Sequence, residues 1–519
     1  MATILITGAT DGIGLALAQQ YATAQHQLIL VGRRPFPPQP SPLFTAQTYC
    51  QADLAQPDAA DTIAHWLENQ GIHTLDLLIH NAGTGYFGAL AAQPLDQIDA
   101  LLTVNLHSPI TITHRLFPWL QKAQGQVLFV SSVATAVPTP EYAVYGASKM
   151  ALEGFARSLR IEWQGQVTVQ TIRPGATRTG MHQKIGLTQA QMNWDKFPAA
   201  ETVAQQIIRA IEQKQPSTTI GLDNQLLSFV GRNGRVLLDP LLRRSATPLT
   251  SQPTRASTPA CLITGAADGI GRALALRYAQ AGYRIIGLDV DGTKAAHTRA
   301  EIEGQGGQAE FILGDLSSRA GLAAMLPQLG PLGPFNCVIH NAGISAVGRF
   351  EVVPLARQQA VLHLNLHTPL WLTAELFRQN WLTPDASFVF LSSLSYFASY
   401  PGAAVYAASK DGLANYARSL QAAWRGRCLT VFPGPVRTAH ARRYSPDNSR
   451  EDGRMPPETL AAAIFRAEQT GRTRLIPGAV NKLMGAAGHL FPGLLEMGMK
   501  KVILEKLEEG KVIGNSVIE

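Results

Sequence analysis

The chain repeats itself at an offset of about 260 residues. The offset stays between 257 and 262 and the order of the repeated strings is constant. A repeat of this length is far longer than the period of a solenoid. It therefore predicts two related domains in one polypeptide. The matched strings are ITGATDGIGLALAQQYA (6–22) with ITGAADGIGRALALRYA (263–279), LLIHNAG (77–83) with CVIHNAG (337–343), VNLHSPI (104–110) with LNLHTPL (364–370), and AVYGASK (143–149) with AVYAASK (404–410).

The junction between the two copies has the composition of a linker. The 519 residues fit two domains of about 250 residues. Residues 245–259, SATPLTSQPTRASTP, are rich in Ser, Thr and Pro and have no apolar periodicity. We expect a first domain at 1–245, a linker at 246–259, a second domain at 260–490 and a C-terminal amphipathic tail at 491–519.

Short β-branched runs alternate with amphipathic helical stretches in both halves. Strands that alternate with helices of 10–15 residues are typical of βαβ units, in which helices cover both faces of a parallel sheet. The sequence therefore predicts an α/β fold with two doubly wound parallel-sheet domains in tandem. The expected strands are ATILIT, QLILV, LDLLIH, QVLFVSS and VTVQTI in the first half and ACLITG, RIIGLD, CVIH, SFVFLSS and CLTVF in the second.

Composition excludes several other classes of protein. The net charge is +7, but the Lys and Arg residues are scattered, which argues against nucleic-acid binding. The four cysteines show no paired spacing, so we expect no disulfide framework and no metal site. The sequence begins on a strand-like run and has no apolar stretch of membrane-spanning length. We expect a cytoplasmic protein without a leader peptide or a transmembrane span.

A glycine-rich turn follows the first expected strand of each half. A phosphate pair needs close approach to backbone N–H groups at a helix N-terminus, and side chains at these positions would obstruct it. An ordinary strand–helix turn is the alternative, but the turn occurs twice, each time as the first of its domain. The glycines are Gly8, Gly12 and Gly14, then Gly265, Gly269 and Gly271.

Tyr145 and Lys149 are four residues apart, as are Tyr406 and Lys410, so each pair shares one helix face. A free tyrosine ionises near pH 10, and acid–base work near neutrality requires its pKa to fall by about 3 units. A neighbouring ammonium and a hydrogen-bonding hydroxyl act in that direction. The hydroxyl lies 13 residues upstream, with the adjacent serine as the alternative in each half. The candidates are Ser132 or Ser131, and Ser393 or Ser392.

Together these motifs resemble those of the short-chain dehydrogenases/reductases, over nearly the whole length of each half. The resemblance implies a Rossmann-type sheet of about seven strands and one NAD(P) molecule in each half. It implies that Tyr exchanges the substrate proton, that Lys lowers the tyrosine pKa and holds the nicotinamide ribose, that Ser binds the reacting oxygen, and that Asn supports a water. The implied catalytic residues are Asn105, Ser132, Tyr145 and Lys149, and Asn365, Ser393, Tyr406 and Lys410.

The resemblance also assigns the cofactor-binding residues. Bracing of the sheet is the alternative role for Asn81 and Asn341. In the first half the assigned residues are Gly8, Gly12, Ile13, Gly14, Arg33, Arg34, Asp53, Leu54, Asn81, Gly83, Pro174, Gly175 and Thr179. In the second half they are Gly265, Gly269, Ile270, Gly271, Asp289, Asp315, Leu316, Asn341, Gly343, Pro433, Gly434 and Thr438.

The end of the second strand separates the two cofactors. The first half has Gly32 there, followed by Arg33 and Arg34, whereas the second has Asp289. A carboxylate accepts hydrogen bonds from ribose hydroxyls and repels a 2′-phosphate, while a guanidinium suits that phosphate. We expect NADP in the first domain and NAD in the second. A solvated turn is the alternative for the arginines, and a strand-end turn residue is the alternative for Asp289.

The expected function is a bifunctional oxidoreductase that transfers hydride between NAD(P) and a small alcohol/ketone substrate in each half. The alternatives are two halves acting in series as a net epimerase or redox-neutral pair, and one half serving as a non-catalytic NAD(P)-binding scaffold. Arg442, Arg443 and Arg450 either meet an anionic group or belong to a solvated loop. We expect an intramolecular pseudo-dimer, with further self-association open, and a tail that packs on a partner subunit or rests peripherally on a membrane.

Overall fold

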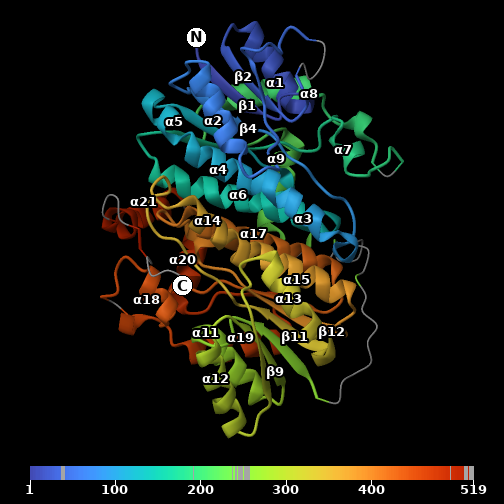
Figure 1. Ribbon diagram of the computed structural model, residues 1–519, viewed down its shortest axis with the longest axis vertical. Helices are drawn as coiled ribbons and strands as arrows, with labels where there is room; N and C mark the ends of the chain where they lie inside the picture. The colour runs from blue at the N-terminus through green and yellow to red at the C-terminus, as the bar shows by residue number, and fades with distance from the viewer. Residues whose placement is uncertain are drawn as a thin grey trace. The chain divides into compact units, whose positions relative to one another are not determined.

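The chain forms two compact units, each built on one seven-stranded sheet (Figure 1). The computed structural model describes residues 1–36, 41–190, 192–235, 238–239, 242, 249, 258–449, 451–490, 492–507 and 512–513. The first unit comprises Met1–Gly88 and Asp96–Leu241, and the second comprises Ala89–Leu95 and Leu242–Glu519.

The first sheet is parallel throughout, in the order β3-β2-β1-β4-β5-β6-β7. The chain runs outward from β1 to β3 and then returns to β4 on the other side of β1. The strand order therefore reverses between β1 and β4, which is where open α/β sheets bind ligands. The strands are β1 (Thr3–Thr7), β2 (Gln27–Gly32), β3 (Tyr49–Gln51), β4 (Leu77–His80), β5 (Gln126–Val130), β6 (Thr168–Arg173) and β7 (Ser217–Thr219).

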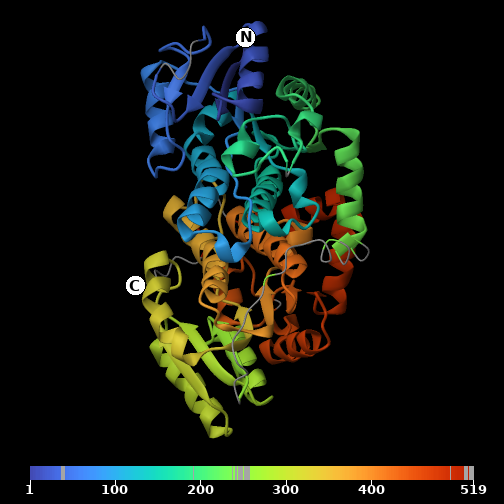
Figure 2. The same cartoon turned by 90° about the vertical axis from the view of Figure 1, so that its right-hand side faces the viewer.

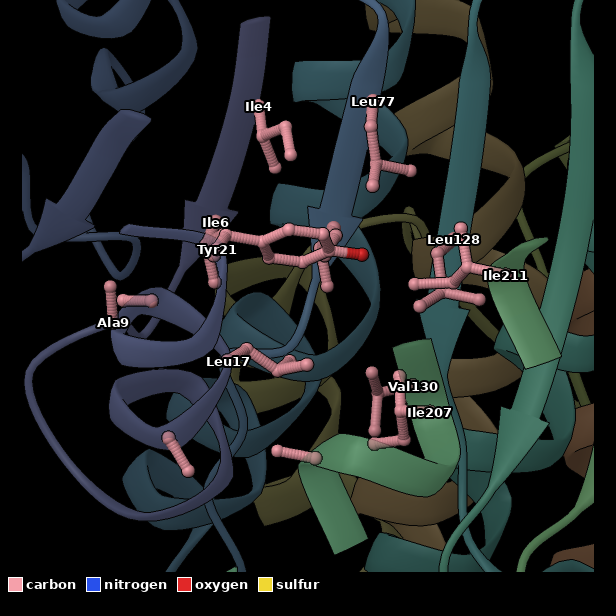
Figure 3. Close-up of a cluster of buried hydrophobic side chains, with 14 of the residues drawn as sticks. Ile4, Ile6, Ala9, Leu17, Tyr21, Leu77, Leu128, Val130, Ile207 and Ile211 are labelled. Carbon is pink, nitrogen blue, oxygen red and sulfur yellow. The ribbon is translucent and has the colours of Figure 1, made fainter. Parts of the chain in front are cut away.

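Helices cover both faces of the first sheet, with α1 packed on α8 and α2 packed on α4 (Figure 1). The ring of Tyr21 lies over the sheet among isoleucine and leucine side chains of β1, β4, β5 and α8 (Figure 3). The helices are α1 (Gly12–Thr23), α2 (Ala59–Asn69), α3 (Leu95–Leu102), α4 (Ser108–Arg115), α5 (Phe117–Ala123), α6 (Ala143–Glu162), α7 (Met181–Lys184), α8 (Ala200–Glu212) and α9 (Leu222–Asn233).

The second sheet repeats this topology, in the order β10-β9-β8-β11-β12-β13-β14. Its first strands are the yellow-green arrows of Figure 2. Its strands are β8 (Ala260–Thr264), β9 (Arg284–Asp289), β10 (Ala309–Leu313), β11 (Phe335–His340), β12 (Leu382–Leu391), β13 (Arg427–Val431) and β14 (Arg474–Leu475). Its helices are α11 (Gly269–Ala279), α12 (Gly292–Gly304), α13 (Arg319–Leu329), α14 (Leu355–Leu362), α15 (Thr368–Arg378), α16 (Ser395–Ala398), α17 (Ala404–Ala423), α18 (Ala439–Tyr444), α19 (Pro457–Gln469), α20 (Ala479–Leu490) and α21 (Pro492–Val502).

The predicted fold class is confirmed, since both units are doubly wound parallel sheets. Every strand expected from the sequence is present, whereas β3, β7, β10 and β14 were not expected. Three of these four have only two or three residues, too few to carry a hydrophobic period. Among the described residues, none of the helices has the length and apolar character that crossing a membrane requires.

Most of the expected linker lies outside the described residues. Leu249 is an exception: its N–H donates to the carbonyl of Ala423 at 3.0 Å, and its side chain is buried. At least one linker residue is therefore packed against the second unit, at the end of α17.

A buried ion pair distinguishes the core of the first unit. Glu153 of α6 accepts two hydrogen bonds from the guanidinium of Arg173, at 2.7 and 2.6 Å, and both side chains are buried. Burial raises the pKa of Glu153, but the Arg173 charge and hydrogen bonds lower it further, to about 2. The repeat places Ala414 and Phe432 at the equivalent positions of the second unit. The ion pair therefore belongs to one copy of the fold.

Replacing Glu153 by Gln should destabilise the first unit by about 3–5 kcal/mol, because Arg173 is left buried without a counter-charge. The double variant E153A/R173F, which copies the second unit, should lose less than E153Q. Hydrogen–deuterium exchange in urea would report on each unit separately. In the parent chain, the stability from Glu153 is present above the unfolded pKa of about 4.5 and is lost as pH falls towards 2. Equal loss in both units would contradict this account.

Candidate active site

The glycine turns lie at the carboxyl ends of β1 and β8, where the strand order reverses. Gly8 and Gly12 have φ of +66° and +53°, and Gly265 and Gly269 have +65° and +54°. A Cβ at Gly14 would lie 2.2 Å from the carbonyl oxygen of Gly8, so a side chain there would open the turn. Ile13 and Ile270 pack partly buried on the cores. The turns thus present backbone at a helix N-terminus, as a dinucleotide phosphate requires.

Asn81 and Asn341 brace these turns. The Asn81 amide donates to the carbonyls of Thr7 and Gly8, at 3.1 and 3.3 Å. Asn341 donates to Thr264 and Gly265 in the same way, at 3.1 and 2.9 Å. The bracing role that the sequence left as an alternative is therefore present in both units, because the amide ties the end of β4 or β11 to the glycine turn.

The last residue of the second strand differs between the units. The Asp289 carboxylate accepts from the N–H of Ala267 in the glycine turn, at 2.8 Å, and from the N–H of Val290, at 2.8 Å. In the first unit, a Cβ at Gly32 would lie 2.7 Å from the Thr10 side chain and 3.0 Å from the hydroxyl of Tyr49. Thr10 occupies the position of Ala267 in the repeat. A side chain at Gly32 would therefore require Thr10 and Tyr49 to move, whereas the second unit already holds a carboxylate in place.

Positive charge lies near the first glycine turn. Arg33 and Arg34 are exposed after β2, and Tyr49 donates to the Arg34 carbonyl at 2.6 Å. Burial raises the pKa of Asp11, but its pairing with Lys184 and the charge of Arg34 bring that pKa below its usual value. Arg34 thus acts electrostatically on the turn itself.

The Tyr–Lys pairs occupy the start of α6 and α17. The Lys149 ammonium lies 5.9 Å from the ring centre of Tyr145 and donates to the Val130 carbonyl at 3.0 Å. Lys410 lies 5.7 Å from the Tyr406 ring centre and donates to the Leu391 carbonyl at 3.0 Å. A Cβ at Gly83 would lie 3.3 Å from the Lys149 nitrogen. Glycine at this position therefore leaves space in front of the lysine.

The two serines of each pair have different partners. Ser132 and Ser393 are hydrogen-bonded to the hydroxyls of Tyr145 and Tyr406. Ser131 donates to Glu153 at 2.7 Å, and Ser392 donates to the Lys410 carbonyl at 2.9 Å. The hydroxyl beside the tyrosine is therefore the second serine in each unit.

Burial dominates the ionisation of these groups. It raises the pKa of Tyr145 and of Tyr406, against the opposing effect of the serine hydrogen bond. It lowers the pKa of Lys149 and of Lys410 to about 8. The lowered tyrosine pKa expected from the sequence therefore has to come from positive charge brought close to the hydroxyl.

Asn105 and Asn365 are fully buried in π-helical turns, η2 (Thr103–His107) and η7 (His363–His367). The Asn105 amide accepts from the N–H of Thr84 at 2.8 Å and donates to the Thr84 carbonyl at 2.9 Å. It also donates to the hydroxyl of Ser148 at 3.1 Å. Asn365 makes the same three contacts with Ile344 and Ser409. Such π-turns are frequent at functional sites.

The remaining assigned residues lie along the carboxyl edge of each sheet. Thr179 and Thr438 approach Gly12 and Gly269, since a Cβ at either glycine would lie 3.1 or 3.3 Å from the threonine methyl group. The segments that contain them follow β6 and β13 and begin at Pro174-Gly175 and Pro433-Gly434. Asp53-Leu54 and Asp315-Leu316 follow β3 and β10, and both leucines are buried.

Sequence reasoning missed Ser148 and Ser409, which link the buried asparagines to α6 and α17. Each stands directly before the lysine within the repeated string AVYxASK, so the repeat carried a signal for them. Of the arginines considered for an anionic group, Arg442 pairs with Glu451 at 2.6 Å, and Arg450 lies outside the described residues.

Comparison with known proteins agrees with this geometry. The profile of the family described as short chain dehydrogenase matches residues 2–190 and again residues 259–449. The 1-deoxy-11-beta-hydroxypentalenate dehydrogenase of Streptomyces exfoliatus is 33% identical over 219 residues, which cover 40% of this chain and 79% of that protein. Serine 3-dehydrogenase of Rhizobium radiobacter is 34% identical over 181 residues, covering 34% of this chain and 72% of that protein.

A solved structure shares the fold over both units. An N-terminal ketoreductase from the macrolactin assembly line aligns with a TM-score of 0.60 at 15% identity, covering 92% of this chain and 86% of that chain. The two family matches span most of the polypeptide. The chain therefore belongs to the short-chain dehydrogenase/reductase family, as two domains in tandem. It is an NAD(P)-dependent oxidoreductase that acts on CH–OH groups.

Lys149→Met should stabilise the first unit at pH 7 by about 1–3 kcal/mol, because it removes an ammonium that burial disfavours. The folded pKa lies below the unfolded value of 10.5, so the unfolded chain binds more protons between pH 8 and 10.5. The stabilisation should therefore shrink as pH rises through that window. Hydrogen–deuterium exchange of α6 in urea would measure it, with exposed Lys122→Met as the control. If Lys149→Met instead destabilised the first unit at pH 7, the lowered pKa of Lys149 in the folded state would be contradicted.

Proposed function

We propose that the chain is a bifunctional oxidoreductase in which each half transfers hydride between a nicotinamide cofactor and an alcohol/ketone pair. The observation that carries the proposal is that both units hold the same four side chains in the same contacts. Asn105, Ser132, Tyr145 and Lys149 in the first unit have the same neighbours as Asn365, Ser393, Tyr406 and Lys410 in the second. A copy without catalytic work has no need to keep this set.

Each residue has a role in the proposed reaction. Ser132 holds the substrate oxygen, and the Tyr145 hydroxyl donates a proton to it in reduction and accepts one in oxidation. Lys149 uses one N–H on the Val130 carbonyl, which leaves two donors for ribose hydroxyls. Its charge offsets the effect of burial on Tyr145. Asn105 keeps the turn beside Lys149 in place for a water. The bound nicotinamide supplies or accepts the hydride.

We propose that the first half prefers NADP and the second NAD. Asp289 is fixed at the end of β9 with its carboxylate beside the glycine turn, where it suits ribose hydroxyls and repels a 2′-phosphate. Gly32 leaves that position without a carboxylate, and the neighbouring Arg33 and Arg34 offer guanidinium groups for the phosphate.

Opposite cofactor preferences favour a second candidate function, in which the halves act in series. One half would oxidise a secondary alcohol with NAD⁺, giving ketone, NADH and a proton. The other would reduce that ketone with NADPH and a proton, from the opposite face. The net result is epimerisation of the carbinol carbon with hydride moved from NADPH to NAD⁺. The scaffold alternative is less well supported, because neither set of four residues has lost a member.

We also propose that the protein is cytoplasmic, and that its domain boundaries are those expected from the sequence. These are 1–245 and 260–490 for the two domains, 246–259 for the linker and 491–519 for the tail. Free, buried thiols are typical of proteins from a reducing compartment. All four cysteines of the chain, Cys50, Cys261, Cys337 and Cys428, are free and buried.

Tyr145→Phe in the full chain should abolish turnover by the first half, and the remaining activity should prefer NADH. Tyr406→Phe should leave an activity that prefers NADPH. A screen of alcohols and ketones with both cofactors would measure the ratio of NADH-dependent to NADPH-dependent activity in each variant. Cofactor binding by either variant should be unchanged. Full activity of either variant on every substrate would make that half a scaffold.

Asp289→Gly in the Tyr145→Phe background should relax discrimination against NADPH, because the repelling carboxylate is removed. The matched control is Asp291→Gly, two residues further on. A cofactor preference unaffected by Asp289→Gly would reject the assignment of this carboxylate.

We also propose that the two halves form an internal pseudo-dimer. The segments GFARSLRIEW (154–163) and NYARSLQAAW (415–424) keep apolar residues at helical spacing after the catalytic lysine. A linker of about 15 residues spans several tens of Å when extended, enough for the halves to meet. Small-angle scattering and cross-linking should show one compact particle with links between these segments. Separately tumbling lobes would contradict the pseudo-dimer.

A further inference from the structure

The final described residues of the chain pack beside the second catalytic tyrosine. Leu504 and Leu507 are each 5% exposed and form a cluster with buried Val347 and Ala403. We name this the tail cluster. The partly buried residues packed against it are Tyr400, Tyr406, Tyr444 and Ile513. All described members are apolar or tyrosine, so the tail brings an apolar surface into contact with a catalytic side chain.

Three contacts hold the tail in this place. The N–H of Ile513 donates to the carbonyl of Val347 at 2.7 Å, in an antiparallel bridge. The ammonium of Lys506 pairs with the carboxylate of Asp447 at 2.5 Å. Leu507 packs so closely on Gly402 that a Cβ there would lie 2.3 Å from the Leu507 Cδ1. The helices before the tail, α20 and α21 (labelled in Figure 1), both pack on α16 of the same unit.

The first unit fills the equivalent space differently. Its backbone makes the corresponding hydrogen bond, since Gly88 donates to the Glu141 carbonyl at 3.0 Å as Gly348 donates to the Gly402 carbonyl at 2.8 Å. The repeat places Tyr142 at the position of Ala403 and Phe87 at the position of Val347. These two rings stack edge to face at 5.1 Å. Tyr142 also contacts the catalytic Tyr145, at 5.8 Å. In the second unit, the smaller Val347 and Ala403 stand at these positions, and the leucines of the tail pack against them.

The tail cluster also contacts α18, through Tyr444. Tyr444 of α18 contacts the ring of His440 at 4.8 Å. The cluster therefore lies between α18 and the helix that carries Tyr406 and Lys410.

We propose that Leu504 and Leu507 form an apolar wall of the substrate pocket in the second half and select substrates with an alkyl or aryl group beside the reacting carbon. This rests on the proposed function of that half. A substrate whose oxygen meets the Tyr406 hydroxyl lies next to the Tyr406 ring, which the tail cluster contacts. A polar or charged group there loses its water without gaining a partner, whereas an apolar group is stabilised by burial.

The test uses the full chain with Tyr145→Phe, so that turnover belongs to the second half. Over a homologous series of 2-alkanones with NADH, kcat/KM should rise by up to about fourfold per methylene until the wall is covered. The double variant L504S/L507S should flatten this rise and lower kcat/KM for the longest ketones at least tenfold, with NADH affinity unchanged. Leu483→Ser, at an exposed leucine of α20, is the matched control.

A second variant and a second readout test the apolar wall separately from the proposed catalysis of the second half. Ala403→Tyr, which introduces the residue of the first unit, should displace the leucines and flatten the series in the same way. Saturation-transfer NMR should detect contact with the alkyl protons of 2-decanone in the parent chain and its loss in L504S/L507S. Alkyl contact without any turnover would reject the proposed catalysis and keep the wall. Unchanged selectivity and contact, or a higher kcat/KM for every ketone in L504S/L507S, would overturn the wall.

Discussion

The candidate active site of each unit depends on one buried amide. Asn105 bonds both backbone groups of Thr84 and the hydroxyl of Ser148. It thereby joins the loop after β4, the π-helical turn η2 and the helix that carries Tyr145 and Lys149. An unpaired buried amide costs about 1–3 kcal/mol, so these three segments keep one relative position. Asn365 does the same in the second unit.

Around this shared frame the two copies differ at the positions to which we assign specificity. At the expected cofactor site, the second unit has a carboxylate held against the glycine turn, whereas the first has a glycine that Thr10 and Tyr49 approach closely. At the substrate, the difference is between an aromatic wall built from the unit's own loops and one completed by the C-terminal tail. In the core, the first copy has the Glu153–Arg173 ion pair, whereas the second copy has the apolar residues Ala414 and Phe432 at the equivalent positions. In the proposed function, the two copies carry out the same chemistry with different cofactors and different substrates.

The sequence predicted what the chain encodes locally or repeats. The glycine turns, the Tyr–Lys spacing and the central strands follow from local pattern. Because each of them occurs twice in the chain, the second copy supported the prediction made from the first. It could not predict contacts between distant segments. Nothing around Leu507 indicates that it meets Gly402, and the expectation for the tail was a partner subunit or a membrane. The choice between Ser131 and Ser132 likewise needed Glu153, whose hydrogen bond occupies Ser131. The tyrosine pKa depends on burial, which a motif does not report.

The central claim is that one chain carries two complete and different cofactor sites. Calorimetric titration of the full chain tests it most directly, with NADPH added after saturation by NADH and then in the reverse order. The account predicts one tight site for each nucleotide per chain, with each still binding when the other is saturated at its own site. A total of one nucleotide per chain, or two sites with the same preference, would contradict it.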